Sequence, residues 1–510
     1  FGKPDSVKTV MAGQTYWRRY GYTPAGRGDT VDISGGGLSF MGRKYLYNAA
    51  KGTLSTIRLN GTAATSLFLD NNFQVNSLTL SGGDGETHLF NSLHRTMKVT
   101  SSPAGYNPQT ERDIGFDGAN RVSEQDFGGG NTAELYGYDN LGRLSTRTSG
   151  YWNTAPPPWC PDPNIGFACH PQTDWVTTSA ETFLYDSAGN RVDHGGSYTT
   201  GNRIHLFDGC SYITDADGNV TSRSQDVGCS KALGSFTWHA EGLLATVTTG
   251  GTTIALKYDA GGRLVRKDVN GVPQSHFLWD GDVLIAELDG NGTVKRAEYS
   301  YYPATDHLHA LIIGTTIYYA HADAAGNVIA LTDVSTHLKR TYGYDAWGTQ
   351  TSGTDYLLFN GYDRARWKGS LLVLPEMNIY YMRNRWYESG TGRFLSEDPL
   401  GGLNRYVYAG NDPINGNDPS GLLQCAGEMC GDGWSHYSGG ANDNELGRMM
   451  ACNGTSGGGL AWAIGLGMAA LRAGYVGVVY DATSNLRIVI VGGFLTPGGV
   501  WLSHVNSEKV

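Results

Sequence analysis

The sequence is poor in charged residues, in helix-forming residues and in long apolar runs. Asp, Glu, Lys and Arg make up 17% of the 510 residues, against about a quarter in an average soluble protein. Ala, Leu, Glu and Lys, which dominate helical bundles and coiled coils, are scarce, and this excludes both architectures. An apolar stretch from Gly457 to Leu471 is shorter than the roughly 18 uncharged residues that a membrane-spanning helix needs. This stretch predicts a buried helix, with a membrane-active segment as the alternative.

A surplus of positive charge is also missing. Lys and Arg number 38 and Asp and Glu number 48, which leaves a net charge of −10. Nucleic acids and anionic membrane surfaces attract basic patches, and the overall balance offers none. We therefore expect no nucleic-acid binding by the main body of the protein, and membrane binding stays undecided.

Glycine and large aromatic residues are abundant instead. The chain contains 73 Gly, 30 Tyr and 12 Trp, and 40% of its residues are apolar. This much apolar and aromatic surface can form a core, which excludes a disordered chain. The glycines fall in turn-like dipeptides and not at every third position, which excludes collagen. A turn-rich, all-β fold is the prediction.

The chain contains seven cysteines, which is an odd number. Cys160 and Cys169 flank a proline-rich insertion, and Cys210 and Cys229 bracket one turn unit. Either pair could be a disulfide in an extracytoplasmic protein, or consist of buried free thiols. The remaining three match no common zinc spacing, so no metal site is expected: Cys425, Cys430 and Cys452. No motif indicates a cofactor.

A short motif recurs along most of the chain. Tyr-Asp-x-x-Gly-Arg-Leu stands at Tyr138 and at Tyr258, and close variants begin at Phe116 and Tyr185. Looser copies follow at intervals of roughly 20 to 26 residues, as expected of stacked repeats: Tyr22, Tyr47, Phe68, Phe90, Trp238, Trp279 and Tyr344. In each copy the aromatic residue ends a strand, Asp bonds the backbone of the turn, and Gly permits the reversal. Each repeat therefore predicts a β-hairpin, and hairpins that cannot bury a face alone must join into a continuous sheet.

Three segments follow from this pattern. Residues 1–377 form the repeat region, which is interrupted by an insertion near residues 151–180. Residues 378–422 form a dense run of motifs, and residues 423–510 lack the repeat and are about the size of one small domain of uncertain α+β type. The opening Phe1-Gly2-Lys3-Pro4 reads as an interior point of a longer precursor.

The motifs of residues 378–422 carry a specific family resemblance. They include Arg385-Trp386-Tyr387, Gly392-Arg393-Phe394, Asp398-Pro399-Leu400-Gly401 and Asp418-Pro419-Ser420-Gly421. With its repeats, the chain resembles the Rhs/YD-repeat family of bacterial polymorphic toxins and Tc toxin C components. Residues 378–422 are similar to the Rhs repeat-associated core of that family. The resemblance implies a hollow β-shell, or cocoon, in which residues 378–422 are an autoprotease and the downstream residues are a variable, often toxic, cargo.

The same resemblance assigns roles to particular residues. Asp398 and Asp418 would be the catalytic carboxylates of an aspartyl-type autoprotease that acts once in cis, and Arg385 would be their helper. The cut would fall between Leu422 and Leu423. Independently of the family, two carboxylates held together share a proton, so that one acts as acid and the other as base. The alternative is that both Asp-Pro-x-Gly units are simple turns, with Arg385 and Glu388 as a surface ion pair.

Three functions compete at this stage. The first is a secreted or cell-surface bacterial shell that cuts itself and retains or delivers a toxin-like effector. Its partners would be its own C-terminal fragment, held inside, and a further N-terminal shell segment or delivery component. The second is an uncut surface adhesin or carbohydrate-binding array, and the third is a structural filament. The carboxylate pair favours the first, because an adhesin does not need it.

Overall fold

The computed structural model describes most of the chain up to Leu422 and only short strands beyond it. The described residues are 4–49, 53–61, 63–69, 75–81, 85–91, 96–101, 112–127, 132–152, 175–302, 307–323, 325–335, 337–355 and 359–422, and then 425–426, 477–480, 486–492, 495–496, 499–500 and 504–509. Cys160, Cys169 and Leu423 lie outside them, as does the apolar stretch from Gly457 to Leu471. The described residues contain no α-helix, which confirms the all-β prediction.

The first large sheet has fifteen strands, and neighbours in sequence pair in antiparallel order except that β5 follows β3 and β4 pairs with β3 alone. Its strands are β1 (Ser6–Met11), β2 (Gln14–Tyr22), β3 (Gly28–Gly35), β4 (Leu38–Ser39), β5 (Arg43–Tyr47), β6 (Leu54–Leu59), β7 (Ala63–Leu69), β8 (Val75–Thr79), β9 (Gly85–Phe90), β10 (Thr96–Ser101), β11 (Arg112–Phe116), β12 (Val122–Phe127), β13 (Thr132–Tyr138), β14 (Leu144–Trp152) and β15 (Trp175–Thr182).

The second large sheet also has fifteen strands, in strict sequence order. They are β16 (Ser197–Thr199), β17 (Arg203–Phe207), β18 (Cys210–Thr214), β19 (Val220–Gln225), β20 (Gly234–Trp238), β21 (Leu244–Thr249), β22 (Thr252–Tyr258), β23 (Leu264–Val269), β24 (Val272–Asp280), β25 (Val283–Asp289), β26 (Lys295–Tyr301), β27 (Leu308–Ile313), β28 (Thr316–Ala322), β29 (Val328–Asp333) and β30 (Leu338–Thr341).

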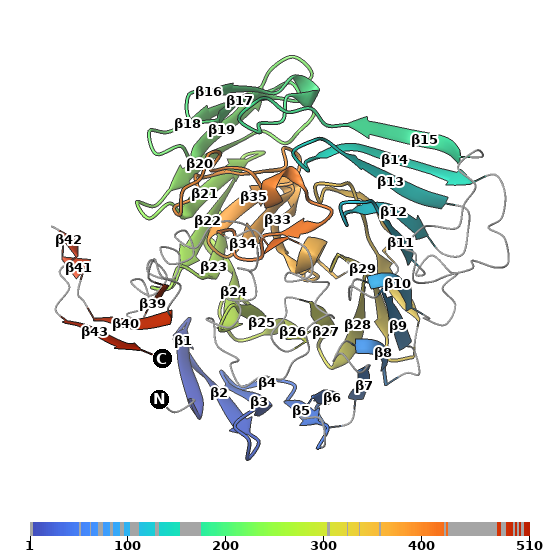
Figure 1. Ribbon diagram of the computed structural model, residues 1–510. Coiled ribbons are helices and arrows are strands. Elements are labelled where there is room, and N and C mark those ends of the chain that lie inside the picture. Colours follow the sequence, from blue (N-terminus) through green and yellow to red (C-terminus); the bar gives the residue numbers. More distant parts are fainter. Residues whose placement is uncertain are drawn as a thin grey trace.

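The rest of the described chain forms short elements. A two-stranded sheet joins β31 (Gly343–Tyr344) and β32 (Gln350–Ser352), and a four-stranded sheet joins β33 (Leu371–Leu374), β34 (Ile379–Met382), β35 (Arg385–Glu388) and β36 (Arg393–Phe394). The 3-10 turns are η2 (Asp193–Gly195), η3 (Trp367–Gly369), η4 (Pro375–Met377) and η5 (Ala409–Asn411). We call residues 359–422 the core segment. Figure 1 shows the second sheet, in green to yellow, curving around this segment, which is drawn in orange.

The repeat motif folds as the sequence predicts. At Asp139 the main-chain carbonyl accepts from Gly142, whose φ is +81°, and one carboxylate oxygen accepts the amide of Leu141 at 2.9 Å. The other oxygen binds the Arg143 guanidinium at 2.7 Å. The aspartate therefore organises the turn, and glycine supplies the left-handed conformation that the reversal requires.

Successive repeats are joined by their aromatic anchors. The hydroxyl of Tyr138 donates to the carbonyl of Val122 at 2.6 Å, and the guanidinium of Arg121 lies 4.3 Å from the centre of the Tyr138 ring. The same bond to a carbonyl of the preceding repeat recurs from Tyr185 to Leu144, Trp238 to Val220, Tyr258 to Leu244, Trp279 to Leu264 and Tyr344 to Val328. Each anchor thus ties its hairpin to the one before it.

Strands β25 to β29 are buried along most of their length, unlike the half-exposed strands at the start of the first sheet. One face packs on the first sheet, where Ile312 shares a cluster with Ile57. The other face packs on the core segment, where Leu311 shares a cluster with Trp386. A sheet covered on both faces reads as a continuous apolar run instead of an alternating one.

A disulfide joins Cys210 and Cys229. It fastens the start of β18 to the loop that follows β19, where the Lys231 ammonium donates to the carbonyl of Gly390 at 3.1 Å. We call the second large sheet the wall of the shell. The disulfide therefore anchors a loop of this wall that touches the core segment.

Beyond Leu422 only strands are described. They are β38 (Cys425–Ala426), which pairs with β37 (Gly416–Asn417) of the core segment, then β39 (Gly477–Tyr480), β40 (Leu486–Gly492), β41 (Leu495–Thr496), β42 (Gly499–Val500) and β43 (His504–Lys509). In Figure 1, strands β39 to β43 lie to the left of the two large sheets and not between them. Within the described part of the chain, no helix has the length and apolar character needed to span a bilayer.

Candidate functional site

The site is built on the hairpin of β34 and β35. Both strands are fully buried, and Met382 pairs with Arg385 across the turn. Aromatic residues dominate the two strands, because they fill space against the wall on one side and the rest of the core segment on the other. Arg385 is the first residue of β35, so its side chain starts from a fixed backbone.

Arg385 brings the two Asp-Pro-x-Gly motifs together. Its Nη2 atom lies 2.9 Å from Oδ2 of Asp398 and 3.2 Å from Oδ2 of Asp418. The exposed side-chain fractions are only 3%, 12% and 4%, respectively. The guanidinium carbon lies 3.6 Å from the centre of the Phe394 ring, which holds the group flat. Two carboxylates that are 20 residues apart thus share one nitrogen of a buried cation.

Asp398 opens a tight turn. Its amide donates to the carbonyl of Arg405 at 2.9 Å, its carboxylate accepts the amide of Leu400 at 2.8 Å, and its carbonyl accepts from Gly401 at 3.2 Å. One carboxylate oxygen is therefore used by the turn, and the other faces Arg385. The interpretation of this motif as a turn is correct, and it is compatible with a site.

Asp418 opens the second turn and reaches the predicted cleavage point. Its Oδ1 atom accepts the amide of Leu422 at 3.0 Å and the hydroxyl of Ser420 at 3.4 Å. The carbonyl of Gly421 accepts from Nε of Arg385. Both sides of the Gly421–Leu422 peptide bond are thus held by the site. The next peptide bond along the chain, between Leu422 and Leu423, is the one predicted to be cut.

Burial perturbs the titration of these groups. Desolvation raises the pKa of the Asp398 carboxyl, Arg385 opposes the shift, and Asp418 adds to it. Desolvation also lowers the pKa of Arg385, against the pull of the two carboxylates. Two neighbouring carboxyls in different environments, one of them with a raised pKa, can act as an acid and a base.

Two features near the site were not predicted. The hydroxyl of Tyr408 donates to Oδ1 of Asn417 at 3.1 Å and accepts the amide of Asp418 at 3.4 Å, so it fixes the start of the second turn. Glu388, considered above as a surface partner of Arg385, is buried and pairs with Arg223 of the wall. The sequence carries no signal for either contact except their position within the dense motif run.

The third Asp-Pro, at Asp412, has a different environment. Its carboxylate binds Nδ2 of Asn415 at 2.9 Å and 3.0 Å, and burial raises its pKa. It closes a local turn. Among the described residues, no group of three or more His, Cys, Asp or Glu side chains is placed to hold a metal ion.

Sequence comparisons relate this chain to a YD-shell family and to proteins named as nucleases and toxins. A profile described as "Teneurin YD-shell" matches residues 172–414. The tRNA3(Ser)-specific nuclease WapA of Bacillus spizizenii is 31% identical over 275 residues, which are 49% of this chain and 11% of that protein. Double-stranded DNA deaminase toxin A of Burkholderia cenocepacia is 24% identical over 372 residues, or 66% of this chain and 25% of the relative. The chain thus spans a small part of the length of these relatives.

Solved structures show the same fold. A crystal structure of TcdB2-TccC3 without its hypervariable C-terminal region superposes with a TM-score of 0.55 at 15% identity, over 80% of this chain and 21% of that one. The complex TcdB2-TccC3-Cdc42 gives a TM-score of 0.54 at 15% identity, over 80% and 22%. At this identity the likeness concerns the fold.

Proposed function

This chain is an Rhs/YD-shell protein related to polymorphic toxins, and from that premise we propose that it cuts itself after Leu422 and releases a C-terminal effector. The observation that supports the proposal is the pair of buried carboxylates, Asp398 and Asp418, on one nitrogen of Arg385. Asp418 also binds the amide of Leu422, the residue before the proposed cut. A purely structural turn does not need a second carboxylate beside it.

The chemistry follows from the two carboxyl environments. Asp418 accepts hydrogen bonds from Arg385, Ser420 and Leu422, which favour its ionised form. The pKa of Asp398 is raised by burial, so we assign Asp398 as the acid of the pair. Asp418 takes a proton from a water molecule whose oxygen attacks the carbonyl carbon of Leu422, while Asp398 donates its proton to the carbonyl oxygen.

The second half of the reaction restores the site. As the tetrahedral intermediate collapses, the oxygen returns its proton to Asp398 and the C–N bond breaks. The leaving nitrogen of Leu423 takes the proton that Asp418 had received. The products are a carboxyl group on Leu422 and an amino group on Leu423, and the titration belongs to the pair rather than to either residue.

Residues 423–510 would be the released effector. Relatives of this chain are named as a tRNA nuclease, a DNA deaminase toxin and a toxin protein. The matches cover a small share of those relatives, so they assign no activity to this segment. We propose an extracytoplasmic toxin whose shell, completed by further segments or partner chains, holds the fragment until delivery.

The direct test is the intact mass of the full chain under denaturing conditions. We expect two fragments, residues 1–422 and 423–510, which elute together from gel filtration in native buffer. A cut one bond earlier, between Gly421 and Leu422, would shift both masses by one leucine residue. A single uncut chain after prolonged incubation would contradict the protease and favour the adhesin interpretation.

The effector role has its own test in a bacterial host. Residues 423–510 expressed alone, in the cytoplasm or exported to the periplasm, are expected to arrest growth, and the full chain is expected to be tolerated. The physical reason is that the shell would keep the fragment from its target. The control is the same segment in reversed sequence order at equal expression. Normal growth in both compartments would argue against an effector.

A further inference from the structure

Three consecutive carbonyl groups before the proposed cut are bound by three consecutive side chains of another hairpin. Nη1 of Arg383 donates to the carbonyl of Pro419 at 2.8 Å. The amide and Nδ2 of Asn384 donate to the carbonyl of Ser420 at 3.2 Å and 3.0 Å.

Arg385 completes this series, because its Nε donates to the carbonyl of Gly421. We call residues 383–385 the clasp and residues 418–421 the cleavage turn. Each side chain of the clasp meets the carbonyl of the residue 36 positions later. A shift of the cleavage turn by one residue would therefore break all three contacts together.

The cleavage turn has little room to move within the clasp. Gly421 has a φ of +65°, and a Cβ atom added there would lie 2.6 Å from the carbonyl oxygen of Met382 and 3.1 Å from the amide nitrogen of Arg385. Only glycine fits so close to the hairpin backbone. A small cavity of about 30 Å³ lies beside Arg383 and Pro419.

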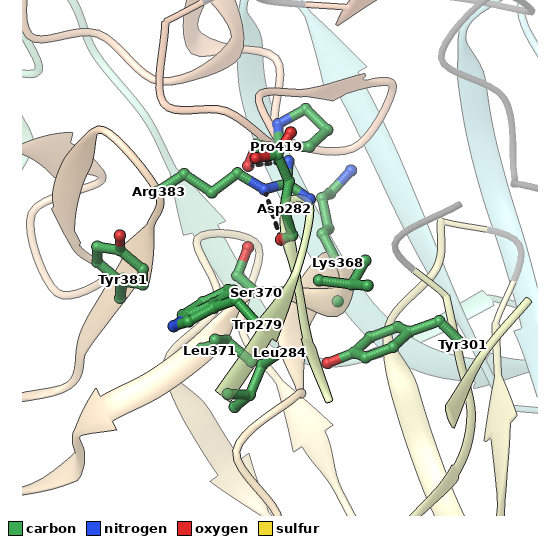
Figure 2. Close-up of a pocket in the computed structure, with 12 residues that line it drawn as sticks. Trp279, Asp282, Leu284, Tyr301, Lys368, Ser370, Leu371, Tyr381, Arg383 and Pro419 are labelled. Atoms are coloured by element: carbon green, nitrogen blue, oxygen red, sulfur yellow. Dashed lines mark hydrogen bonds between the residues drawn. The ribbon is translucent and has the colours of Figure 1, made fainter. Parts of the chain in front are cut away.

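Arg383 also reaches the wall of the shell. Its Nε donates to the carbonyl of Asp282, in the turn between β24 and β25, at 3.1 Å. Figure 2 shows this guanidinium between Asp282 and Pro419, with dashed hydrogen bonds to both. The planar guanidinium of Arg383 therefore links two distant turns. One is the wall turn at Asp282, 101 residues earlier, and the other is the cleavage turn at Pro419, 36 residues later.

We propose that Arg383 and Asn384 are positioning residues that fix which peptide bond is cut, and that Arg383 makes the cut depend on closure of the β24–β25 wall. The inference rests on the self-cleavage proposed above. Before the wall turn is in place, the carbonyl of Asp282 is not there to orient the guanidinium of Arg383. The cleavage turn is then held by fewer contacts. Cleavage is then fast only in a chain whose shell has folded.

The expected size of the effect comes from the geometry of attack. Displacing reacting groups by about 1 Å costs roughly 100-fold in rate. Arg383→Gln removes the guanidinium that bridges the carbonyls of Asp282 and Pro419. Asn384→Asp replaces the Nδ2 donor with a carboxylate oxygen, which repels the carbonyl of Ser420. Each variant of the full chain is expected to cut about 10- to 100-fold more slowly, or to give fragments displaced by one or more residues.

The experiment starts from uncut chain in urea, diluted into native buffer and sampled by intact mass. The matched control is Arg263→Gln, because Nη1 of Arg263 donates to the carbonyl of Gly281 in the same wall turn at 3.0 Å but contacts no part of the cleavage turn among its described bonds. This control is expected to cut at the wild-type rate and position. A mere loss of wall stability would slow both arginine variants equally.

The outcomes separate this inference from the proposed function. Slow or misplaced cutting in Arg383→Gln and Asn384→Asp, with a normal Arg263→Gln, supports the clasp. Wild-type behaviour of Arg383→Gln overturns it, and equal slowing by Arg263→Gln overturns the positioning role of Arg383, because wall stability alone would then account for both. If the wild type is itself uncut, the proposed function fails, and the clasp is tested by amide hydrogen exchange of residues 420–422. Faster exchange confined to Arg383→Gln supports it, and unchanged exchange overturns it.

Discussion

Full chains carrying Asp398→Asn or Asp418→Asn are expected to remain whole under conditions in which the wild type is cut. Asparagine keeps the shape of each side chain but can neither hold nor pass on the proton of the pair. Losing a positioned acid or base costs about 10²- to 10⁴-fold in rate, so each variant would appear as one uncut species by intact mass.

Asp412→Asn is the matched control for these variants. It removes a carboxylate from the third Asp-Pro, which is also buried but binds Asn415 instead of Arg385. Asparagine keeps the size of the side chain and one oxygen that can accept from Asn415, and the described contacts of this site do not include Arg385, so normal cutting is expected. Cutting by both Asp398→Asn and Asp418→Asn at the wild-type rate would exclude the aspartyl mechanism.

The pH dependence of the wild-type rate checks the assignment of acid and base. The acid must be protonated, so the rate falls as the pH rises through the raised pKa of Asp398. The base must be ionised, so the rate also falls as the pH drops far enough to protonate Asp418. A bell-shaped profile that is displaced toward higher pH than ordinary aspartate is expected from refolding at different pH.

Arg364→Met is expected to lower the free energy of unfolding by about 3 to 5 kcal/mol. Glu287 of β25 is fully buried, and its two carboxylate oxygens bind Nε and Nη2 of Arg364 at 2.6 Å and 2.8 Å. Removing the guanidinium leaves a buried charge with the Ser275 hydroxyl, at 2.5 Å, as its remaining described partner. Urea unfolding followed by tryptophan fluorescence measures the loss.

Two further variants show whether the isolated charge is the cause. Adding Glu287→Gln to Arg364→Met removes that charge and should recover part of the stability. Lys98→Met breaks a half-exposed contact, 3.5 Å from Asp113, and should cost less than about 1 kcal/mol. An Arg364→Met chain as stable as Lys98→Met would show that the buried pair does not hold the wall on the core segment.

The repeat region could be predicted from the sequence because its determinants are local. In Tyr138-Asp139-Asn140-Leu141-Gly142-Arg143, the aspartate bonds atoms two to four residues away and Gly142 has the required positive φ. Such contacts need no distant partner. The same locality explains why both Asp-Pro-x-Gly units could be identified as turns.

The composition and motif order also determined the fold class and the candidate site residues. Few helix formers, many glycines and an aromatic anchor in each repeat leave antiparallel hairpins as the consistent solution. The family resemblance then singled out Arg385, Asp398 and Asp418, and the structure brings these three together. Their catalytic role and the cut at Leu422 remain predictions.

Only the tertiary structure decided how these local pieces meet. Strands β25 to β29 are buried on both faces because the first sheet packs on one side and the core segment on the other, and strand patterns do not specify which layer covers which face. Arg383 meets Asp282 across 101 residues, and Glu388 meets Arg223 across 165. Such contacts depend on the accumulated curvature of many strands, which no short motif encodes. Burial, and with it the raised pKa of Asp398, exists only after those layers close.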